Sequence, residues 1–113
     1  IHFLTSTFVL EPDAAKELKG REIARFAIHY DDDSSETVPV VFSKDVADWW
    51  VATFAAPVDP ARVGWRGTNS ESDPIELAEL VWTNPHPGKT ITTIDFISTG
   101  SNTAPFLVGI TLE

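Results

Sequence analysis

Two tryptophan-containing segments of this 113-residue chain have the residue types for binding chemistry. A sugar ring has an apolar face of C–H groups that stacks on an aromatic plane, and its hydroxyl groups need amide, carboxylate or guanidinium partners. Trp65 and Arg66 stand close to Asn69 in the sequence, and Gly67 between them lets the backbone turn tightly. This group suits a sugar, but Arg66 could equally form an ion pair with a nearby acid while Asn69 supports a turn.

The second segment runs from Trp82 through Thr-Asn-Pro-His-Pro to Gly88. Asn84 precedes a proline and is therefore held extended, and two prolines flank His86, so the connection is stiff. Stiffness is a form of preorganisation for binding. It is also what a sharp corner between two strands requires, so the sequence leaves both interpretations open.

The adjacent Trp49 and Trp50 cannot both point inward on a strand, and on a helical turn they diverge by about 100°. One of them should therefore lie nearer to solvent, although any of the four Trp residues could simply fill the core. The candidate ligand-binding residues are Trp50, Trp65, Arg66, Asn69, Trp82, Asn84 and His86.

An acidic run, Asp-Asp-Asp-Ser-Ser-Glu at 31–36, is rich in oxygen ligands of the kind that calcium prefers. The weak metal candidates are Asp31, Asp33 and Glu36, so a structural calcium ion is the one cofactor that the sequence leaves open. The run lacks the glycine and the spacing of an EF-hand loop. A solvated hairpin tip is the favoured interpretation.

The sequence contains few arrangements of residues that are typical of a catalytic site. His2, His29 and His86 are scattered singly, without the spacing of a known metal site, and neither a nucleophile elbow nor a phosphate-binding loop is present. Many pairs could form among the 17 acidic residues, but nothing selects one of them. We expect no enzymatic activity.

The composition of the chain limits the classes of partner that it can bind. A formal net charge of −9 repels nucleic acid and anionic lipid headgroups. No apolar run approaches the roughly 20 residues that span a bilayer, so we expect no membrane insertion. No cysteine is present, which excludes disulfides and thiolate zinc sites. At 113 residues the chain has room for one domain, residues 1–113. Because it begins with Ile1 rather than Met, we expect either a mature secreted chain or, as the favoured interpretation, a domain excised from a larger protein.

The apolar periodicity is mostly two, which predicts strands. We expect them at residues 1–10, 21–30, 37–43, 63–67, 75–82, 90–98 and 105–113. Residues 75–82 could also line a helix, but their neighbours favour a strand. Residues 11–20 predict a turn or one loose helical turn, and residues 44–50 a short helical turn.

Strands 21–30 and 37–43 should form a hairpin around the acidic run. Their core faces would be Ala24, Phe26, Ile28 and Tyr30, and Val38, Val40 and Phe42. Pro39 cannot donate a ladder hydrogen bond, so its strand should be an edge or carry a bulge. In 1–10 one parity carries Leu4, Phe8 and Leu10, although Phe3 and Val9 blur the alternation. In 105–113, Phe106, Val108, Ile110 and Leu112 should share one face.

About seven or eight short strands separated by turns predict an all-β fold, an antiparallel β-sandwich. The segments at 30–50, 63–69 and 80–113 together resemble the bacterial galactose-binding-like jelly rolls that are appended to larger extracytoplasmic proteins. The resemblance spans roughly residues 3–112. It implies sugar binding through loops at one end of the sandwich, often beside a structural calcium, although some members only brace a neighbouring domain.

Two functions therefore remain as hypotheses. The first is a non-catalytic carbohydrate-binding module that stacks a glycan on tryptophan. The second is a structural or protein-interaction domain whose partner is a neighbouring domain of the same protein; an exposed apolar patch or dimerisation would favour it. The sequence does not determine the sugar or the oligomeric state.

Overall fold

A computed structural model describes residues 1–10, 15–50, 62–68, 70 and 74–112 of the chain. This part is all-β, with seven strands in two antiparallel sheets, as the sequence predicts. The strands are β1 (His2–Val9), β2 (Glu22–Tyr30), β3 (Ser35–Val41), β4 (Val63–Thr68), β5 (Pro74–Val81), β6 (Ile91–Ser98) and β7 (Thr103–Thr111). The described residues contain one short helix, α1 (Ala15–Leu18), which matches the predicted helical turn. No helix in these ranges has the length and apolar character to cross a membrane.

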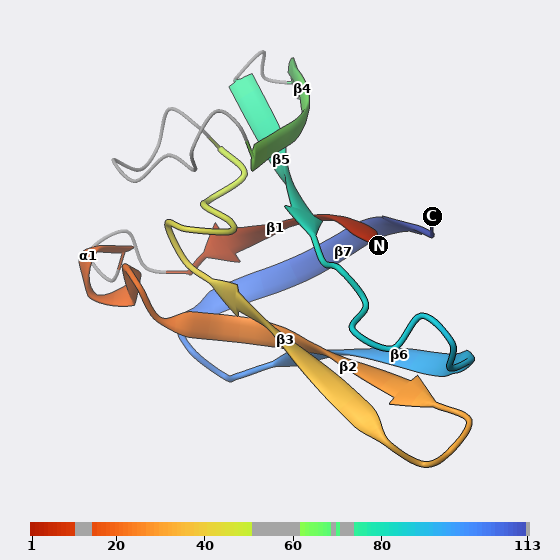
Figure 1. Ribbon diagram of the computed structural model, residues 1–113. Coiled ribbons are helices and arrows are strands. Elements are labelled where there is room, and N and C mark those ends of the chain that lie inside the picture. Colours follow the sequence, from red (N-terminus) through yellow and green to blue (C-terminus); the bar gives the residue numbers. More distant parts are fainter. Residues whose placement is uncertain (11–14, 51–61, 69, 71–73, 113) are drawn as a thin grey trace.

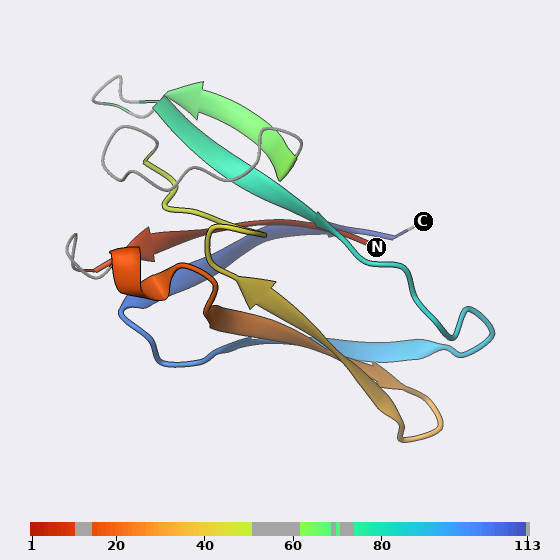
Figure 2. The same cartoon turned by 60° about the vertical axis from the view of Figure 1, so that its left-hand side comes forward.

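The sheets form the two layers of a β-sandwich (Figure 1). One has the strand order β4-β5-β1-β7 and the other the order β3-β2-β6. Figure 2 shows two of the connections between the layers, residues 82–90 at one end and residues 99–102 at the other. The predicted strand at 75–82 is therefore confirmed as β5, and the helical alternative is excluded.

Stacked phenylalanine rings join the two layers. Phe3 of β1 stacks on Phe26 of β2, with ring centroids 3.9 Å apart, and Phe26 meets Phe96 of β6 at 4.8 Å. The predicted β2–β3 hairpin and its two core faces are confirmed, since all seven predicted inward side chains are buried. Pro39 lies on β3, which is an edge strand, as its missing N–H predicts.

In β1 the residues that face the core are not the set of alternate residues that the sequence favours. Phe3 and Val9 are buried, whereas Phe8 and Leu10 are exposed. The residues that blurred the alternation therefore face the core. Buried Thr5 and Thr7 share their parity, and a sequence pattern based on apolar residues alone cannot recognise a core face that includes threonine.

The expectation that four apolar residues of β7 share one face is wrong. A register shift pairs Thr5 with Leu107 but Leu4 with Gly109, so Val108 is an extra residue in a bulge. Phe106 lies opposite Ser6 and Ile110 lies opposite Phe3, which are on different faces of β1. The bulge therefore splits the apolar row between the two faces of the sheet.

The helical turn predicted for residues 44–50 does not continue past residue 45. Strands β1 and β5 pair only from His2 to Thr5, and the extended segment 46–50 lies between them where they separate. The backbone of Trp49 bonds to both strands: its N–H donates to Thr7 O at 2.9 Å, and its carbonyl accepts from Glu76 N–H at 2.9 Å. Pairing with two strands outweighs the local helical preference of this segment.

The carboxylate of Asp48 holds this inserted segment in place. It is buried and accepts two backbone hydrogen bonds, from Val9 N–H at 2.8 Å and from Trp50 N–H at 2.8 Å. Burial raises the pKa of the Asp48 carboxyl, and the two donated hydrogen bonds act in the opposite direction. One side chain thus satisfies backbone groups of β1 and of the segment that fills its gap.

We predict that Asp48→Ala lowers the free energy of unfolding by about 2 to 4 kcal/mol, because two N–H groups lose their acceptor. Urea unfolding followed by circular dichroism measures this. Asp31→Ala is the matched control: its exposed side chain predicts a change within about 0.5 kcal/mol. Equal, small effects of the two substitutions would contradict the role assigned to Asp48.

Candidate functional site

Hydrogen bonds hold the stiff segment after β5, residues 82–90, against the tip of the β2–β3 hairpin. The hydroxyl of Tyr30 donates to Asn84 Oδ1 at 2.6 Å, and the backbone N–H of His86 donates to the same oxygen at 2.9 Å. Asn84 therefore uses its amide oxygen to tie the end of β2 to residues 82–90. In this structure the amide oxygen of Asn84 therefore stabilises the connection at residues 82–90 itself, which we call the corner.

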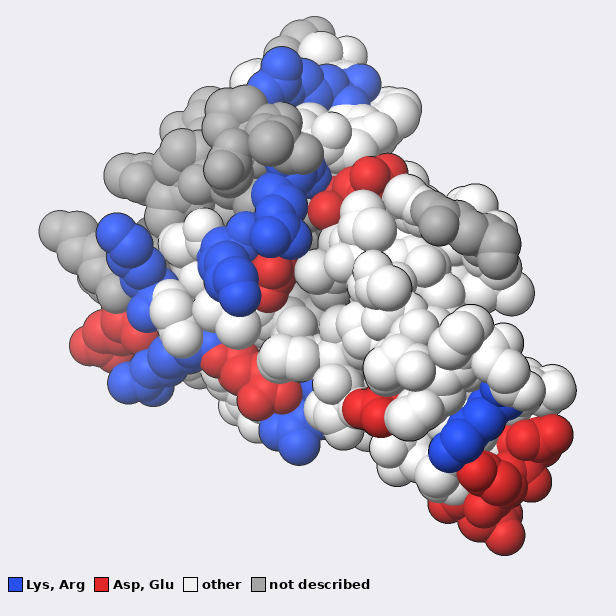
Figure 3. Space-filling view, viewed as in Figure 1, with Lys and Arg blue, Asp and Glu red and all other residues white. Residues whose placement is uncertain are grey.

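Two further side-chain pairs strengthen this attachment. His86 Nε2 lies 2.9 Å from Glu36 Oε1, and its ring meets the edge of the Tyr30 ring with centroids 5.6 Å apart. Lys89 Nζ lies 2.9 Å from Asp32 Oδ2 and 5.4 Å from the centre of the Tyr30 ring. Figure 3 shows the acidic side chains gathered at this hairpin tip beside a single basic one.

The charge states of this cluster follow from its contacts. Hydrogen bonds from Ser34, followed by that from Lys89, hold the pKa of Asp32 well below its ordinary value. Burial, reinforced by the charge of Glu36, raises the pKa of Tyr30. Asp32 is thus an anion and Tyr30 a neutral hydrogen-bond donor at neutral pH.

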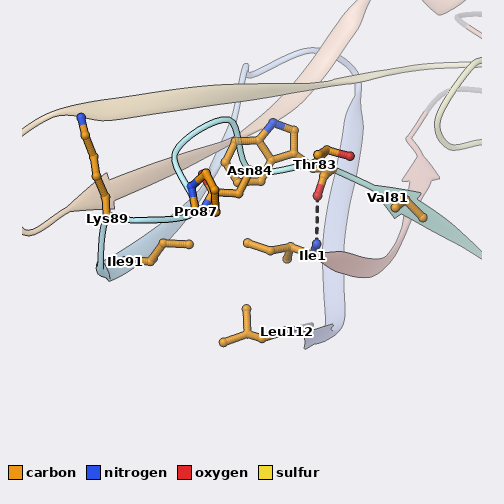
Figure 4. A pocket seen from close by; sticks show the side chains of 9 residues that line it. Ile1, Val81, Thr83, Asn84, Pro87, Lys89, Ile91 and Leu112 are labelled. Carbon is orange, nitrogen blue, oxygen red and sulfur yellow. Dashed lines mark hydrogen bonds between the residues drawn. The ribbon is translucent and has the colours of Figure 1, made fainter.

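A pocket of about 410 Å³ opens beside the fastened segment. Its lining residues are Ile1, Val81, Trp82, Thr83, Asn84, Pro87, Lys89, Ile91 and Leu112. In Figure 4 the side chains of Ile1, Ile91 and Leu112 point toward one common space, while Lys89 extends away from it. Trp82 packs partly against the core, and its carbonyl accepts a hydrogen bond from the Ile1 amino group at 2.9 Å. Six of the lining residues are apolar, and the other three, Thr83, Asn84 and Lys89, are polar.

Trp65 lies elsewhere, on the outer face of the four-stranded sheet. It pairs with Leu77, whose neighbour Ala78 faces the core, so Trp65 and Leu77 face away from the other sheet. The indole ring lies over Gly67: a Cβ atom at that glycine would come within 2.2 Å of the ring atom Cη2. The side chain remains 45% exposed. Gly67 thus makes room for an aromatic ring that leans against its own strand and faces water.

Polar groups share this outer face. Glu79 is two residues from Leu77 on β5 and pairs with Leu4 of β1, so all three are on the outer side. His2 Nδ1 lies 3.5 Å from Glu79 Oε1. We call Trp65, Leu77, Glu79, Leu4 and His2 the outer-face site. These side chains share one face of the sheet, but the Trp65 ring leans over Gly67, which pairs with Ile75, in the direction away from Glu79.

The other predicted site residues do not join this group. Arg66 alternates to the opposite side of β4, where its Nε donates to Glu76 Oε1 at 2.8 Å. Trp50 is half-buried in the inserted segment, and its ring stacks on Trp49 with centroids 6.0 Å apart. Asn69 lies outside the described residues. The seven candidates therefore occupy at least three separate places, with Trp82, Asn84 and His86 at the corner.

The weak metal candidates do not converge. Asp31 and Asp33 are exposed, and Glu36 faces His86 instead. Asp33 has a positive φ of 68°, which a hairpin tip accommodates. Among the residues that the structure describes, no three His, Asp or Glu side chains are grouped so that they could hold a metal ion.

Sequence reasoning missed Glu79 and His2 at the outer-face site, as well as Tyr30 as the anchor of the corner. The register between β1 and β5 brings the first two together, and no motif encodes that register. Tyr30 was recognised as a core residue, which is correct, but its hydroxyl has a second role at the core's edge.

Comparison of the chain with protein-family models, with curated proteins and with solved structures finds no match.

We predict that Tyr30→Phe speeds amide hydrogen exchange in residues 82–90 and lowers the free energy of unfolding by about 1 kcal/mol, since Asn84 loses its shortest hydrogen bond. Exchange followed by mass spectrometry measures the first effect. Thr92→Val is the control, because it removes an exposed hydroxyl that bonds to His29 O outside the corner. Unchanged exchange in Tyr30→Phe would show that the corner does not depend on this bond.

Proposed function

We propose that this domain is a non-catalytic carbohydrate-binding module that stacks a sugar ring on Trp65. The observation that carries the proposal is the position of the Trp65 ring, which lies over Gly67 with 45% of the side chain exposed. An exposed indole offers the C–H face of a sugar an apolar, polarisable surface. Because the ring leans on the strand, little conformational freedom is lost when a ligand stacks on it.

Glu79 and His2 offer polar groups farther along the same face, within reach of a glycan chain that extends from the Trp65 ring. A carboxylate accepts hydrogen bonds from sugar hydroxyls, and an imidazole can donate or accept them. Both lie on the same face as Trp65, one strand and two strands away from it. Their mutual contact orients the carboxylate toward the sheet face rather than leaving it fully mobile.

The corner and its pocket contribute rigidity in this proposal, not the main contacts. Asn84 and His86, two of the sequence candidates, bond to Tyr30 and Glu36, so these contacts hold residues 82–90 in place. The sugar-binding role therefore moves from the end loops to a sheet face. The two antiparallel sheets support a β-sandwich; a galactose-binding-like jelly roll and an extracytoplasmic location remain part of the proposal.

Binding of soluble oligosaccharides, measured by isothermal titration calorimetry across a panel of neutral and acidic glycans, tests the proposal. For a glycan that binds, Trp65→Ala should weaken affinity about tenfold or more, because an aromatic anchor is lost. Gly67→Ala should weaken it as well while leaving the fold intact. The added methyl group displaces only the distal end of the Trp65 ring.

Trp82→Phe is the matched control, because it changes a tryptophan in the pocket and leaves the outer face intact. Its affinity should equal that of the unmodified chain. Loss of binding in Trp82→Phe, with full binding in Gly67→Ala, would move the site to the pocket. The absence of binding to every glycan in the panel would reject the proposed function.

A specific observation supports the second function, a protein-interaction domain. Val108, Ile110 and Leu112, at the C-terminal end of the last sheet strand and just beyond it, are exposed apolar side chains. An exposed apolar surface of this kind is typical of an interaction site.

A further inference from the structure

The four-stranded sheet ends on one side in β7, which pairs only with β1. Half of the backbone N–H and C=O groups of an edge strand point away from the sheet and can bond to another strand. β7 is nine residues long, which makes it one of the two longest described strands. It is therefore the edge with the most backbone to offer.

The other edges carry features that oppose pairing with another chain. β3 contains Glu36 and Pro39, and β6 contains Asp95. β4 has only six residues, with Arg66 among them. Charges, proline and short length are the devices by which natural sheets prevent such pairing.

β7 lacks such a charge. Its sequence, TAPFLVGIT, contains no charged residue, although the chain as a whole carries a net charge of −9. Most of the surface of this acidic chain repels a second copy, but this edge does not.

The apolar side chains of β7 concentrate in its second half. Val108, which the bulge leaves without a partner on β1, is 56% exposed, and Ile110 is 38% exposed. Pro105 offers no N–H and so limits pairing in the first half. The available stretch is therefore residues 107–112.

We propose that this edge pairs with β7 of a second copy of the chain, in an antiparallel dimer related by a two-fold axis. An uncharged apolar strand is the complement that such an edge requires, and β7 itself has that chemistry. A two-fold interface uses the same patch on both subunits, so one self-complementary strand is sufficient. The two four-stranded sheets would become one continuous eight-stranded sheet.

The dimer would also affect glycan binding. This consequence rests on the proposed function, whereas the dimer itself does not. A two-fold axis perpendicular to a continuous sheet keeps like faces on the same side. The two Trp65 rings would therefore lie on one common surface, and a polymeric glycan could bind both sites at once with increased avidity.

Sedimentation equilibrium of the unmodified chain tests the dimer. The contact is short, so we expect weak association that becomes measurable at concentrations up to about 1 mM. The average mass should rise toward twice that of one chain. A constant monomer mass over this range would overturn the proposal.

Val108→Asp and Ile110→Asp should keep the chain monomeric at every concentration, because each places like charges close together across the two-fold axis. Ile97→Asp on β6 is the matched control: its side chain is 43% exposed and the charge change is the same. It should associate like the unmodified chain. Equal loss of association in the control, or dimerisation of Val108→Asp confirmed as folded by circular dichroism, would refute a contact through β7. The affinity of the monomeric Val108→Asp variant for a monosaccharide measures binding at the outer-face site separately from dimerisation.

Discussion

The carboxylate of Asp48 is the constraint on which the four-stranded sheet depends. Strands β1 and β5 are antiparallel and pair only between residues 2–5 of β1 and residues 78–81 of β5, beyond which they separate. The segment at 46–50 enters the gap, and Asp48 accepts the backbone hydrogen bonds of Val9 and Trp50 that would otherwise be buried without a partner. A buried carboxylate is costly unless it is well hydrogen-bonded, and here the two N–H groups provide that compensation.

The inserted segment also determines where the candidate site lies. Because Trp49 bonds to Thr7 and Glu76, the segment at 46–50 connects β5 to β1 where the two strands no longer pair directly, and β4 pairs with β5. Trp65, Glu79 and His2 come from three different strands, so their placement on one face of the sheet depends on this arrangement. The tryptophans at 49 and 50 thus support the sheet, while Trp65 is the one that faces outward on it.

Much of the fold could be predicted from the sequence. Alternation in β2 and β3 identified their core faces correctly because each strand has one apolar and one polar side. The same rule was insufficient in β1, whose buried side includes Thr5 and Thr7, and in β7, where the bulge at Val108 changes the parity midway. The helical turn expected around Trp49 was wrong because long-range pairing decides the structure of that segment.

The candidate site was less predictable than the fold. Trp65 was identified from its residue type and from Gly67 beside it, and the structure gives that glycine a definite reason. Its partners Glu79 and His2 depend on cross-strand register, which a single sequence does not reveal. Asn84 and His86 were recognised as stiff and polar, and the structure shows those properties used to close a corner.

The most direct test of the proposed function observes the four indole N–H signals in an ¹H–¹⁵N NMR spectrum, assigned by single Trp→Phe substitutions. Addition of an oligosaccharide should shift the Trp65 signal in a saturable way. The signals of the half-buried Trp49, Trp50 and Trp82 should stay in place. A shift of Trp82 with Trp65 unchanged, or no shift with any glycan, would contradict a sugar-binding surface on the outer face of the sheet.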